Sequence, residues 1–317
     1  MKVAILGASG FTGRNLLLNL PKDWQIYAFF NTDKTFQDWV IKKNIKVIPI
    51  KVNLSDTFII LGKDIPNHFD LVISLIGNTQ RVAIEEQPLY DFNADTFAIS
   101  NFFSNFTCDK CIYFSSGAVY ENHVGLVSVD KTKGLKPTMS YPIAKLTSEY
   151  IISHFHWRNR INQYLIVRFF GAYGPYQKNN KIVLSTIKKL FIDKEKELNF
   201  TGTGKNLFDA MYVQDAIDWI LLAVQKEFKN QTIDFGLAKP ITIKQLIKSI
   251  AKACDRKDVV INFDGLPPKE DYYFRLGDEN FTVLPPFGYK FKVSLEKGLV
   301  LTRDWILKNV DILWPKN

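Results

Sequence analysis

A serine, a tyrosine and a lysine in this sequence have the types and spacing needed for proton and hydride transfer. Ser116 follows an apolar run, and Tyr141 and Lys145 are four residues apart. Residues at that spacing lie on one face of a helix. A lysine ammonium one turn away favours the phenolate of a tyrosine, whose pKa is otherwise about 10. Such a phenol can take a proton from a sugar or alcohol hydroxyl while hydride leaves the same carbon, and a serine hydroxyl can hold that oxygen. We therefore predict that Ser116, Tyr141 and Lys145 are catalytic.

A tyrosine and a lysine at this spacing are common by chance, so the prediction depends on a site for a hydride carrier. The chain opens with the apolar run Met1–Leu6, followed by the sequence GASGFTG and a helical pattern. This is a G-x-x-G-x-x-G motif in the order strand, turn, helix. Free backbone N–H groups and the positive end of a helix suit a pyrophosphate. We predict a dinucleotide-binding turn made of Gly7, Ser9, Gly10, Phe11, Thr12 and Gly13.

The end of the second strand bears on the choice of dinucleotide. Residues 25–30 read as that strand, and Asn31 and Thr32 follow where an acidic residue would bind the ribose hydroxyls of NAD. Arg14, after the last glycine, is placed to approach a 2′-phosphate. These residues favour NADP(H) over NAD(H), although Asp33 could still serve the ribose.

The first half of the chain alternates strands and helices. Strands are expected at 45–52, 70–76, 111–114 and 164–169, and helices at 93–106 and 141–157. This order predicts an α/β fold, a Rossmann-like doubly wound parallel sheet with helices on both faces. Ligands bind at the carboxyl edge of such sheets. Four residues near strand ends are therefore added to the predicted cofactor site: Asn53, Leu54, Ile76 and Gly77. Tyr141 and Lys145 are expected to contact the cofactor as well.

The pattern of expected strands and helices changes at Gly171. Helices are expected at 181–191, within 211–225, at 241–253 and at 294–308. We predict a dinucleotide-binding domain at 1–170, joined by a strand and helix near 211–238. Residues 171–317 are then mainly a smaller C-terminal substrate-binding lobe.

Composition narrows the class of protein. The chain has 317 residues, 46% hydrophobic, and a formal net charge of +9. The lysines are scattered and no basic stripe with interleaved aromatics occurs, which disfavours nucleic acid as a partner. No apolar run approaches the ~20 residues of a membrane span, and no signal peptide is evident, so a cytoplasmic protein is expected. Cys108 and Cys111 lack the second ligand pair of a zinc site, and we predict no metal.

Six segments resemble blocks of the extended short-chain dehydrogenase/reductase family, which contains the nucleotide-sugar epimerases, dehydratases and reductases. They are GASGFTG, FSSGAVY, YPIAK, RFFGAYGP, MYVQDAID and FGYKFKVSLEKGL, in the family's order. The resemblance implies NAD or NADP, catalysis by the three residues above and a nucleotide-sugar substrate in surface-polysaccharide sugar biosynthesis. It also implies a homodimer joined through the helices beginning near Asn93 and Tyr141. The residues expected to bind the substrate are Arg81, Gly117, Arg168, Gly171 and Lys205.

Departures from the family pattern narrow the chemistry. The 4,6-dehydratases carry an Asp-Glu pair where this chain has Gly117 and Ala118. Decarboxylases place a glutamate, and GDP-fucose synthase a cysteine, at the position of Ala118. These departures leave hydride chemistry at one carbon, as in a 4-keto-sugar reductase or a 4-epimerase.

The usual diphosphate ligands are also replaced. Family members often have an asparagine at the position of Gly171, an arginine at that of Phe208 and a second arginine near Pro267. A buried diphosphate favours bidentate arginine. Here Lys178, Lys181, Lys205 or Arg275 would have to serve, or the substrate is not an ordinary nucleoside-diphosphate sugar. The alternative hypothesis is a non-catalytic NADP-binding sensor or regulatory protein on the same fold.

Overall fold

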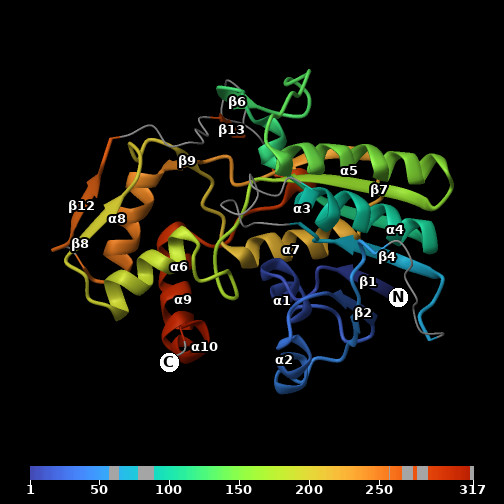
Figure 1. The fold of residues 1–317 in the computed structure, drawn as a ribbon, viewed down its shortest axis with the longest axis horizontal. Coiled ribbons are helices and arrows are strands. Elements are labelled where there is room, and N and C mark those ends of the chain that lie inside the picture. Colours follow the sequence, from blue (N-terminus) through green and yellow to red (C-terminus); the bar gives the residue numbers. More distant parts are fainter. Residues whose placement is uncertain (57–63, 78–88, 257, 266–273, 277–284, 315–317) are drawn as a thin grey trace. The chain divides into compact units, whose positions relative to one another are not determined.

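The computed structural model describes residues 1–56, 64–77, 89–256, 258–265, 274–276 and 285–314 (Figure 1). The chain divides into two compact units. The first comprises Met1–Glu121, Val129–Phe170 and Ala223–Phe235, and the second comprises Asn122–Ser128, Gly171–Leu222 and Gly236–Asn317. In the described residues, no helix combines the length and apolar character needed to cross a bilayer.

The first unit is built on a seven-stranded parallel sheet of order β10-β7-β5-β4-β1-β2-β3. Its strands are β1 (Lys2–Leu6), β2 (Gln25–Phe30), β3 (Ile48–Lys51), β4 (His68–Ser74), β5 (Thr107–Ser116), β7 (Ile161–Phe169) and β10 (Gln231–Phe235). The central strands are apolar because helices cover both faces of a parallel sheet. The predicted Rossmann-like doubly wound sheet is confirmed, and its strand order reverses between β1 and β4, where dinucleotides bind in such folds.

Short helical segments connect these strands. They are α1 (Phe11–Leu17), α2 (Phe36–Lys42), α3 (Leu89–Asp91), η1 (Phe92–Phe97), α4 (Ala98–Asn105), η2 (Gly117–Tyr120) and α5 (Ser140–Trp157). Helices α4 and α5 lie on one face of the sheet, and α1 lies on the other (Figure 1). The core beneath α4 is aromatic, with the Phe102 ring 5.5 Å from that of Phe29 and 4.8 Å from that of Phe106.

The single helix expected at 93–106 is interrupted in the structure. It begins at Leu89, widens into the π-helical turn η1 and continues as α4 to Asn105. The wide turn carries two buried polar residues, Asp95 and Thr96, that hydrogen bond or pair with side chains of α5. Hydrophobic spacing does not reveal these polar contacts, because the partners are distant in the sequence.

The second unit consists of helices with three two-stranded sheets. The pairs are β6 (Gly125–Val127) with β13 (Phe274–Leu276), β8 (Glu197–Phe200) with β12 (Val260–Phe263), and β9 (Leu207–Phe208) with β11 (Ile241–Thr242). The helical segments are α6 (Ile182–Ile187), η3 (Lys188–Ile192), α7 (Val213–Val224), α8 (Ile243–Ala253), η4 (Pro286–Gly288), α9 (Leu295–Leu307) and α10 (Val310–Leu313). Helix α7 groups with this unit up to Leu222, whereas β10 belongs to the large sheet.

Sequence features fix the ends of two helices in this unit. Thr242 caps α8 in a capping box with Gln245, and the Ser294 side chain accepts a hydrogen bond from the backbone of Lys297 at the start of α9. Both helices place apolar side chains in the core of the second unit, among them Leu246 and Leu299, which are fully buried.

Candidate active site

The glycine-rich turn lies at the carboxyl end of β1. The N–H groups of Gly7 and Ala8 both donate to the Phe29 carbonyl of β2, at 3.1 and 3.0 Å. Gly7 has a φ of +78°, in the left-handed region that favours glycine. Helix α1 begins at Phe11 after Gly10, so its first N–H groups have no partner within the helix. These donors, next to the point where the strand order reverses, fit a dinucleotide pyrophosphate.

Gly13 is required by the close packing of α1 on the turn. A Cβ at this position would lie 2.5 Å from the Ala8 carbonyl oxygen and 2.6 Å from that of Gly7. Both are backbone atoms, so relief would require α1 to move away. We expect Gly13→Ala to lower the free energy of unfolding by about 1–3 kcal/mol and to weaken dinucleotide binding. Urea unfolding and calorimetric titration with NAD would measure the two effects, and unchanged binding would argue against a site at this turn.

The Arg14 side chain is held against the end of β2. Its Nη2 donates to Asp33 Oδ2 at 2.7 Å, and its Nε donates to the Ser9 carbonyl at 3.0 Å. The guanidinium lies 4.5 Å from the Trp39 ring centroid. Burial opposes ionisation of Asp33, but hydrogen bonds from Arg14 and Thr35 hold the pKa of this carboxyl below its usual value. Arg14, which was expected to approach a 2′-phosphate, is thus paired with the ionised carboxylate of Asp33.

The remaining residues predicted beside the cofactor lie near the ends of β2 and β3. Asn31 Nδ2 donates to Asn53 Oδ1 at 3.1 Å, which links the two loops. Leu54 is buried and its carbonyl accepts from Asn101, whereas Thr32 is exposed. The structure brings Asn31, Asn53 and Leu54 into one connected region, and their contact with a cofactor stays a prediction.

The three predicted catalytic residues belong to the first unit. Ser116 ends β5 and its Oγ accepts a hydrogen bond from the Ala118 N–H at 3.1 Å. Helix α5 begins at Ser140 and carries Tyr141 and Lys145 one turn apart. Tyr141 is partly exposed, and no contact within the described residues engages its phenol oxygen in a hydrogen bond.

Lys145 is the most constrained of the three residues, with only 2% of its surface exposed. Its Nζ donates to the carbonyls of Ile76 and Phe114, at 2.7 and 2.8 Å. These carbonyls lie beside the carboxyl ends of β4 and β5. A Cβ at Gly77 would lie 3.0 Å from the same nitrogen, so glycine lets the ammonium approach the backbone. Ile76 and Gly77 therefore lie against Lys145, one of the predicted catalytic residues.

Sequence reasoning missed a buried acid in this site. Asp95 Oδ2 lies 2.6 Å from Lys145 Nζ, and both side chains are only 3% exposed. In the sequence, Asp95 is an acidic residue within the segment 93–106 that was expected to form a helix, and nothing beside it marks it as part of the site. Its partner is 50 positions later on another helix, which a local pattern cannot show.

The residues predicted to bind the substrate do not all lie in the first unit with the predicted catalytic residues. Arg168 is buried, and its guanidinium donates to both oxygens of Glu149 and to the Tyr120 hydroxyl. Gly171 and Lys205 belong to the second unit, and Arg81 lies outside the described residues. The substrate role of Arg168 stays a prediction, but its described partners are protein groups.

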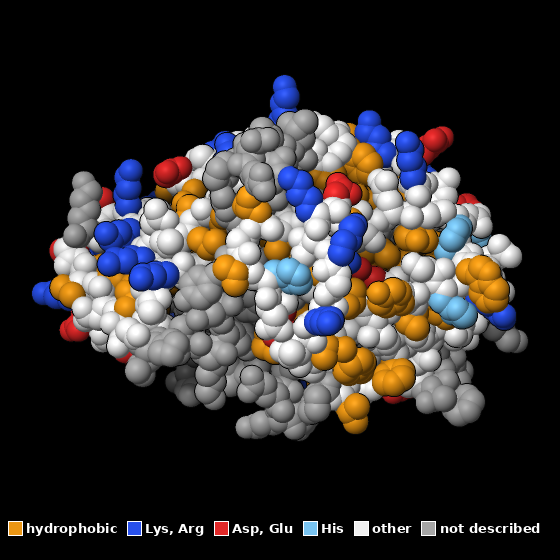
Figure 2. All heavy atoms as spheres, turned by 90° about the horizontal axis from the view of Figure 1, so that it is seen from above, with side chains coloured by type: hydrophobic (Ala, Val, Ile, Leu, Met, Phe, Trp, Pro, Cys, Tyr) orange, Lys and Arg blue, Asp and Glu red, His pale blue; other side chains and the backbone are white. Residues whose placement is uncertain are grey.

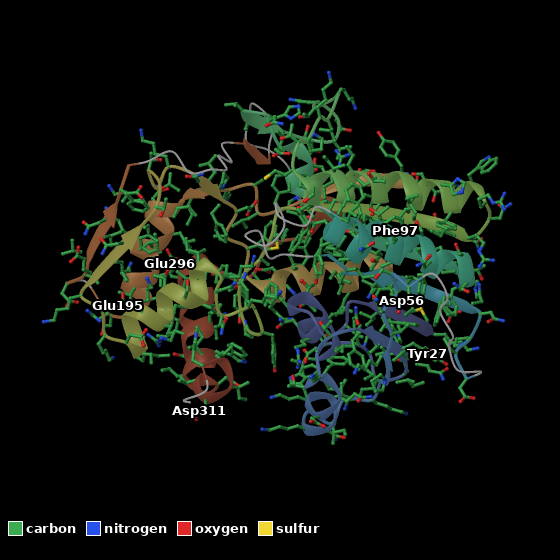
Figure 3. All side chains as sticks on the ribbon, in the orientation of Figure 1. Tyr27, Asp56, Phe97, Glu195, Glu296 and Asp311 are labelled. Carbon is green, nitrogen blue, oxygen red and sulfur yellow. The ribbon has the colours of Figure 1, made fainter. Side chains whose placement is uncertain are left out.

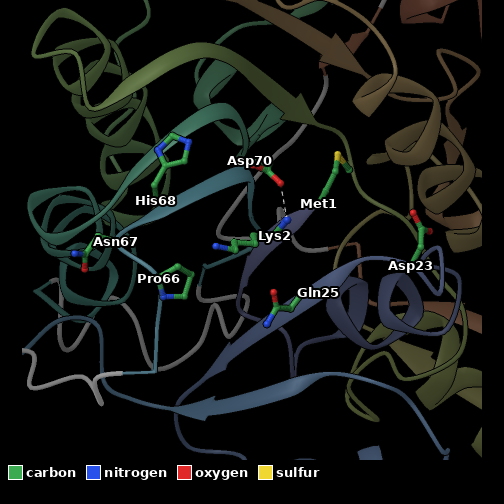
Figure 4. Close-up of a pocket in the computed structure, with 8 residues that line it drawn as sticks. All are labelled: Met1, Lys2, Asp23, Gln25, Pro66, Asn67, His68 and Asp70. Atoms are coloured by element: carbon green, nitrogen blue, oxygen red, sulfur yellow. Dashed lines mark hydrogen bonds between the residues drawn. The ribbon is translucent and has the colours of Figure 1, made fainter.

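An open cavity of about 630 Å³ lies elsewhere on the first unit (Figure 4). It is lined at the amino ends of β1 and β4 by residues that include Lys2 and Asp70, and the Lys2 N–H donates to Asp70 Oδ2 at 2.6 Å. Ligands of doubly wound sheets bind at the opposite edge. We therefore assign the candidate active site to the carboxyl ends of β4 and β5, where Ser116 lies and where Lys145 Nζ contacts the backbone, and not to this cavity.

The two cysteines of the C-x-x-C sequence lie within β5. Both thiols are free and buried, and burial raises the pKa of each. The reactive form of a thiol and the form that binds a metal is the thiolate. These positions therefore favour structural cysteines.

Comparison with known proteins places the chain in a family. Residues 3–236 match the family model for the NAD dependent epimerase/dehydratase family. The chain is 28% identical to GDP-L-colitose synthase of Yersinia pseudotuberculosis over 98% of this chain and 100% of that one. It is 23% identical to the dTDP-D-glucose 4,6-dehydratase of Mus musculus over 97% and 89% of the two chains.

A solved structure shows the same fold over the whole chain. The UDP-glucuronic acid 4-epimerase of Bacillus cereus, in complex with UDP-glucuronic acid and NAD, has a TM-score of 0.79 at 23% identity. The alignment covers 97% of this chain and 99% of that chain. The family match extends over most of the first unit and into the second, and it confirms the resemblance read from the six sequence blocks. The chain belongs to the NAD-dependent epimerase/dehydratase family of nucleotide-sugar enzymes, the extended short-chain dehydrogenases/reductases.

Proposed function

We propose that this protein transfers hydride at one carbon of a nucleotide-activated sugar, with 4-epimerisation as the leading reaction. The observation that carries the proposal is the placement of Lys145 at the carboxyl ends of β4 and β5, one turn after Tyr141. Ser116 lies at the end of the same β5 strand. This arrangement supports the assignment of a phenol base, its cationic neighbour and a hydroxyl that holds the reacting oxygen.

In the proposed reaction, the bound nicotinamide supplies the hydride acceptor and donor. Tyr141 removes the proton from the sugar hydroxyl as hydride leaves that carbon, and returns the proton when hydride returns. Lys145 favours the phenolate by its charge. Ser116 donates its hydroxyl proton to the substrate oxygen and so orients it.

Dehydration is disfavoured by the residues that follow Ser116. Gly117 and Ala118 have no acid or base, and a Cβ at Gly117 would lie 3.0 Å from the Phe170 ring. The pocket at residue 117 is therefore filled by an aromatic ring and not open to a carboxylate. Reduction of a 4-keto sugar is the second candidate, since it needs the same three residues and no further acid.

We propose NAD as the cofactor of this chain, in place of the NADP that the sequence around Asn31 favoured. The support is the 2.7 Å ion pair between Arg14 and Asp33. An ionised carboxylate at the end of β2 suits ribose hydroxyls and repels a 2′-phosphate. The family is NAD-dependent, and the Bacillus cereus epimerase is a complex with NAD.

Identification of the nucleotide carried by the purified protein tests this proposal. The protein is denatured and the released nucleotide is analysed by mass spectrometry. We expect stoichiometric NAD(H), because an epimerase returns the hydride to the same substrate and retains its cofactor. An empty protein that NADPH stabilises against heat more than NADH does would contradict the NAD assignment and favour the reductase.

The substrate diphosphate has to be held without the usual arginines. We propose that lysines of the second unit serve, and Lys205 is exposed on a turn of that unit. Lys178 is also exposed, and partial desolvation lowers its pKa. An anionic substrate would favour its charged form.

We further propose a homodimer formed through α4 and α5. Three large side chains are exposed on η1 and α5: Phe97 at 48% (Figure 3), Tyr150 at 70% and Trp157 at 74%. Figure 2 looks onto the face that carries α5, where hydrophobic side chains gather. An exposed apolar surface of this kind is typical of protein contacts.

A charge in this surface is expected to separate the subunits. We expect Tyr150→Glu to halve the molar mass measured by light scattering after gel filtration, because a buried unpaired carboxylate destabilises an interface. Ile41→Glu is the matched control, since Ile41 is 77% exposed on α2. Dimers that survive in Tyr150→Glu and in Trp157→Glu would place the interface elsewhere.

A further inference from the structure

A buried carboxylate in the π-helical turn η1 has no part in the reaction described above. Asp95 is 2% exposed, and its Oδ2 lies 2.6 Å from Lys145 Nζ. Its other oxygen accepts a hydrogen bond from the Tyr113 hydroxyl at 2.8 Å. An ionised acid is costly to bury unless it is paired and hydrogen-bonded, and Asp95 satisfies both conditions.

The Asp95 carboxylate is the third acceptor beside the Lys145 ammonium. A lysine has three N–H donors. The carbonyls of Ile76 and Phe114 and the Asp95 carboxylate provide three acceptors within 2.8 Å. The strand ends and the carboxylate together therefore hold the ammonium in place at the carboxyl ends of β4 and β5.

Groups on two other elements face the Asp95 carboxylate. Ser148 of α5 and Tyr113 of β5 both favour its ionised form by hydrogen bonds. Burial raises the pKa of Asp95, and Lys145, Tyr113 and Ser148 oppose that rise. The next acid on α5, Glu149, is paired with Arg168 and hydrogen-bonded by Ser115.

We propose that Asp95 is a positioning residue that holds Lys145 in place and offsets its charge, and thereby sets the proton affinity of Tyr141. The proposal rests on the proposed function in taking Tyr141 as the base. A lone lysine cation would favour the phenolate strongly, whereas the Lys145–Asp95 pair is neutral as a whole. Asp95 thus keeps the phenol protonated to higher pH than the lysine alone would.

The substitution Asp95→Asn removes the charge of the side chain and leaves its packing unchanged. The asparagine carbonyl oxygen can still accept from Lys145, and its amide can donate to the Tyr113 oxygen. The cavity filled by the side chain is unchanged, because aspartate and asparagine have nearly the same shape. Asp95→Asn therefore leaves Lys145 with its acceptors but without a counter-charge.

The test is a spectrophotometric titration of the Tyr141 phenol in the full chain without substrate. Absorbance of tyrosinate is recorded against pH for the parent protein and for Asp95→Asn. The same titration of Tyr141→Phe in each background is subtracted, so that only Tyr141 remains. We expect the midpoint in Asp95→Asn to fall by about one to two pH units. Asp234→Asn is the matched control, because it removes a buried carboxylate that contacts Tyr120 and Val129, and its midpoint should not move.

A second variant keeps the proposal testable if Asp95→Asn does not fold. Asp95→Ser also removes the carboxylate charge and keeps a hydroxyl in the buried position, so a fall of the midpoint is again expected. A midpoint that is unmoved or raised in the folded variants would overturn the proposal. Failure of the proposed function is a separate result, since the titration needs neither substrate nor turnover.

Discussion

Tyr141→Phe is expected to lower kcat by about 10²–10⁴-fold, the usual contribution of a positioned acid or base. The substitution removes one oxygen from a partly exposed residue at the start of α5. No hydrogen bond to this oxygen is present among the described contacts, so stability should be unchanged. Turnover on UDP-sugars and on 4-keto sugar nucleotides would be followed by chromatography of the products.

Tyr150→Phe is the control for this experiment. Tyr150 lies on the same helix, 70% exposed, and the change again removes only a hydroxyl. Its turnover should equal that of the parent protein. If Tyr141→Phe retained full turnover, the phenol would not be the base. If no nucleotide sugar were converted by the parent protein, the non-catalytic sensor would become the better interpretation.

The sequence predicted those parts of the site whose structure depends on residues close together along the chain. The turn from Gly7 to Gly13 follows from glycine spacing, because only backbone without side chains permits α1 to pack on the turn. The placement of Tyr141 and Lys145 on one helix follows from their spacing, and α5 begins one residue before Tyr141. The parallel sheet follows from the alternation of strands and helices.

The parts that sequence did not predict depend on contacts between distant residues. Asp95 and Lys145 are brought together by the π-helical turn η1, which replaces the regular helix expected there. Arg14 was expected beside a phosphate, but Asp33, nineteen positions later, accepts from it. In both cases a charged side chain seen alone in the sequence has a partner of opposite charge in the fold, and the pairing changes what that charge can do.

Arg168 is the clearest example, since its sequence neighbours suggested a substrate ligand. Arg168 lies on β7. Its Nε and Nη2 donate to the two carboxylate oxygens of Glu149 on α5, at 3.0 and 2.8 Å, and its Nη1 donates to the Tyr120 hydroxyl. Tyr120 in turn donates to Asp234 of β10 at 2.9 Å. Burial raises the pKa of Asp234 to about 6, while the hydrogen bonds from Tyr120 and Val129 favour its ionised form. The chain of contacts ties α5 to the sheet beneath the candidate active site.

Arg168→Met is therefore expected to lower the free energy of unfolding by about 3–5 kcal/mol, because it leaves Glu149 charged, buried and without its cation. Urea unfolding followed by circular dichroism would measure the loss. Lys188→Met is the control, since Lys188 pairs with Asp193 on the surface and an exposed pair contributes less than about 1 kcal/mol.

The double variant Arg168→Met/Glu149→Leu separates the cost of an unpaired charge from the cost of lost packing. Without Glu149 the carboxylate that Arg168→Met leaves unpaired is gone, so the double variant should be more stable than Arg168→Met alone. If Arg168→Met cost no more than Lys188→Met, the buried pair would not hold α5 on the sheet. Arg168 would then be available for the substrate role that its position in the sequence suggested.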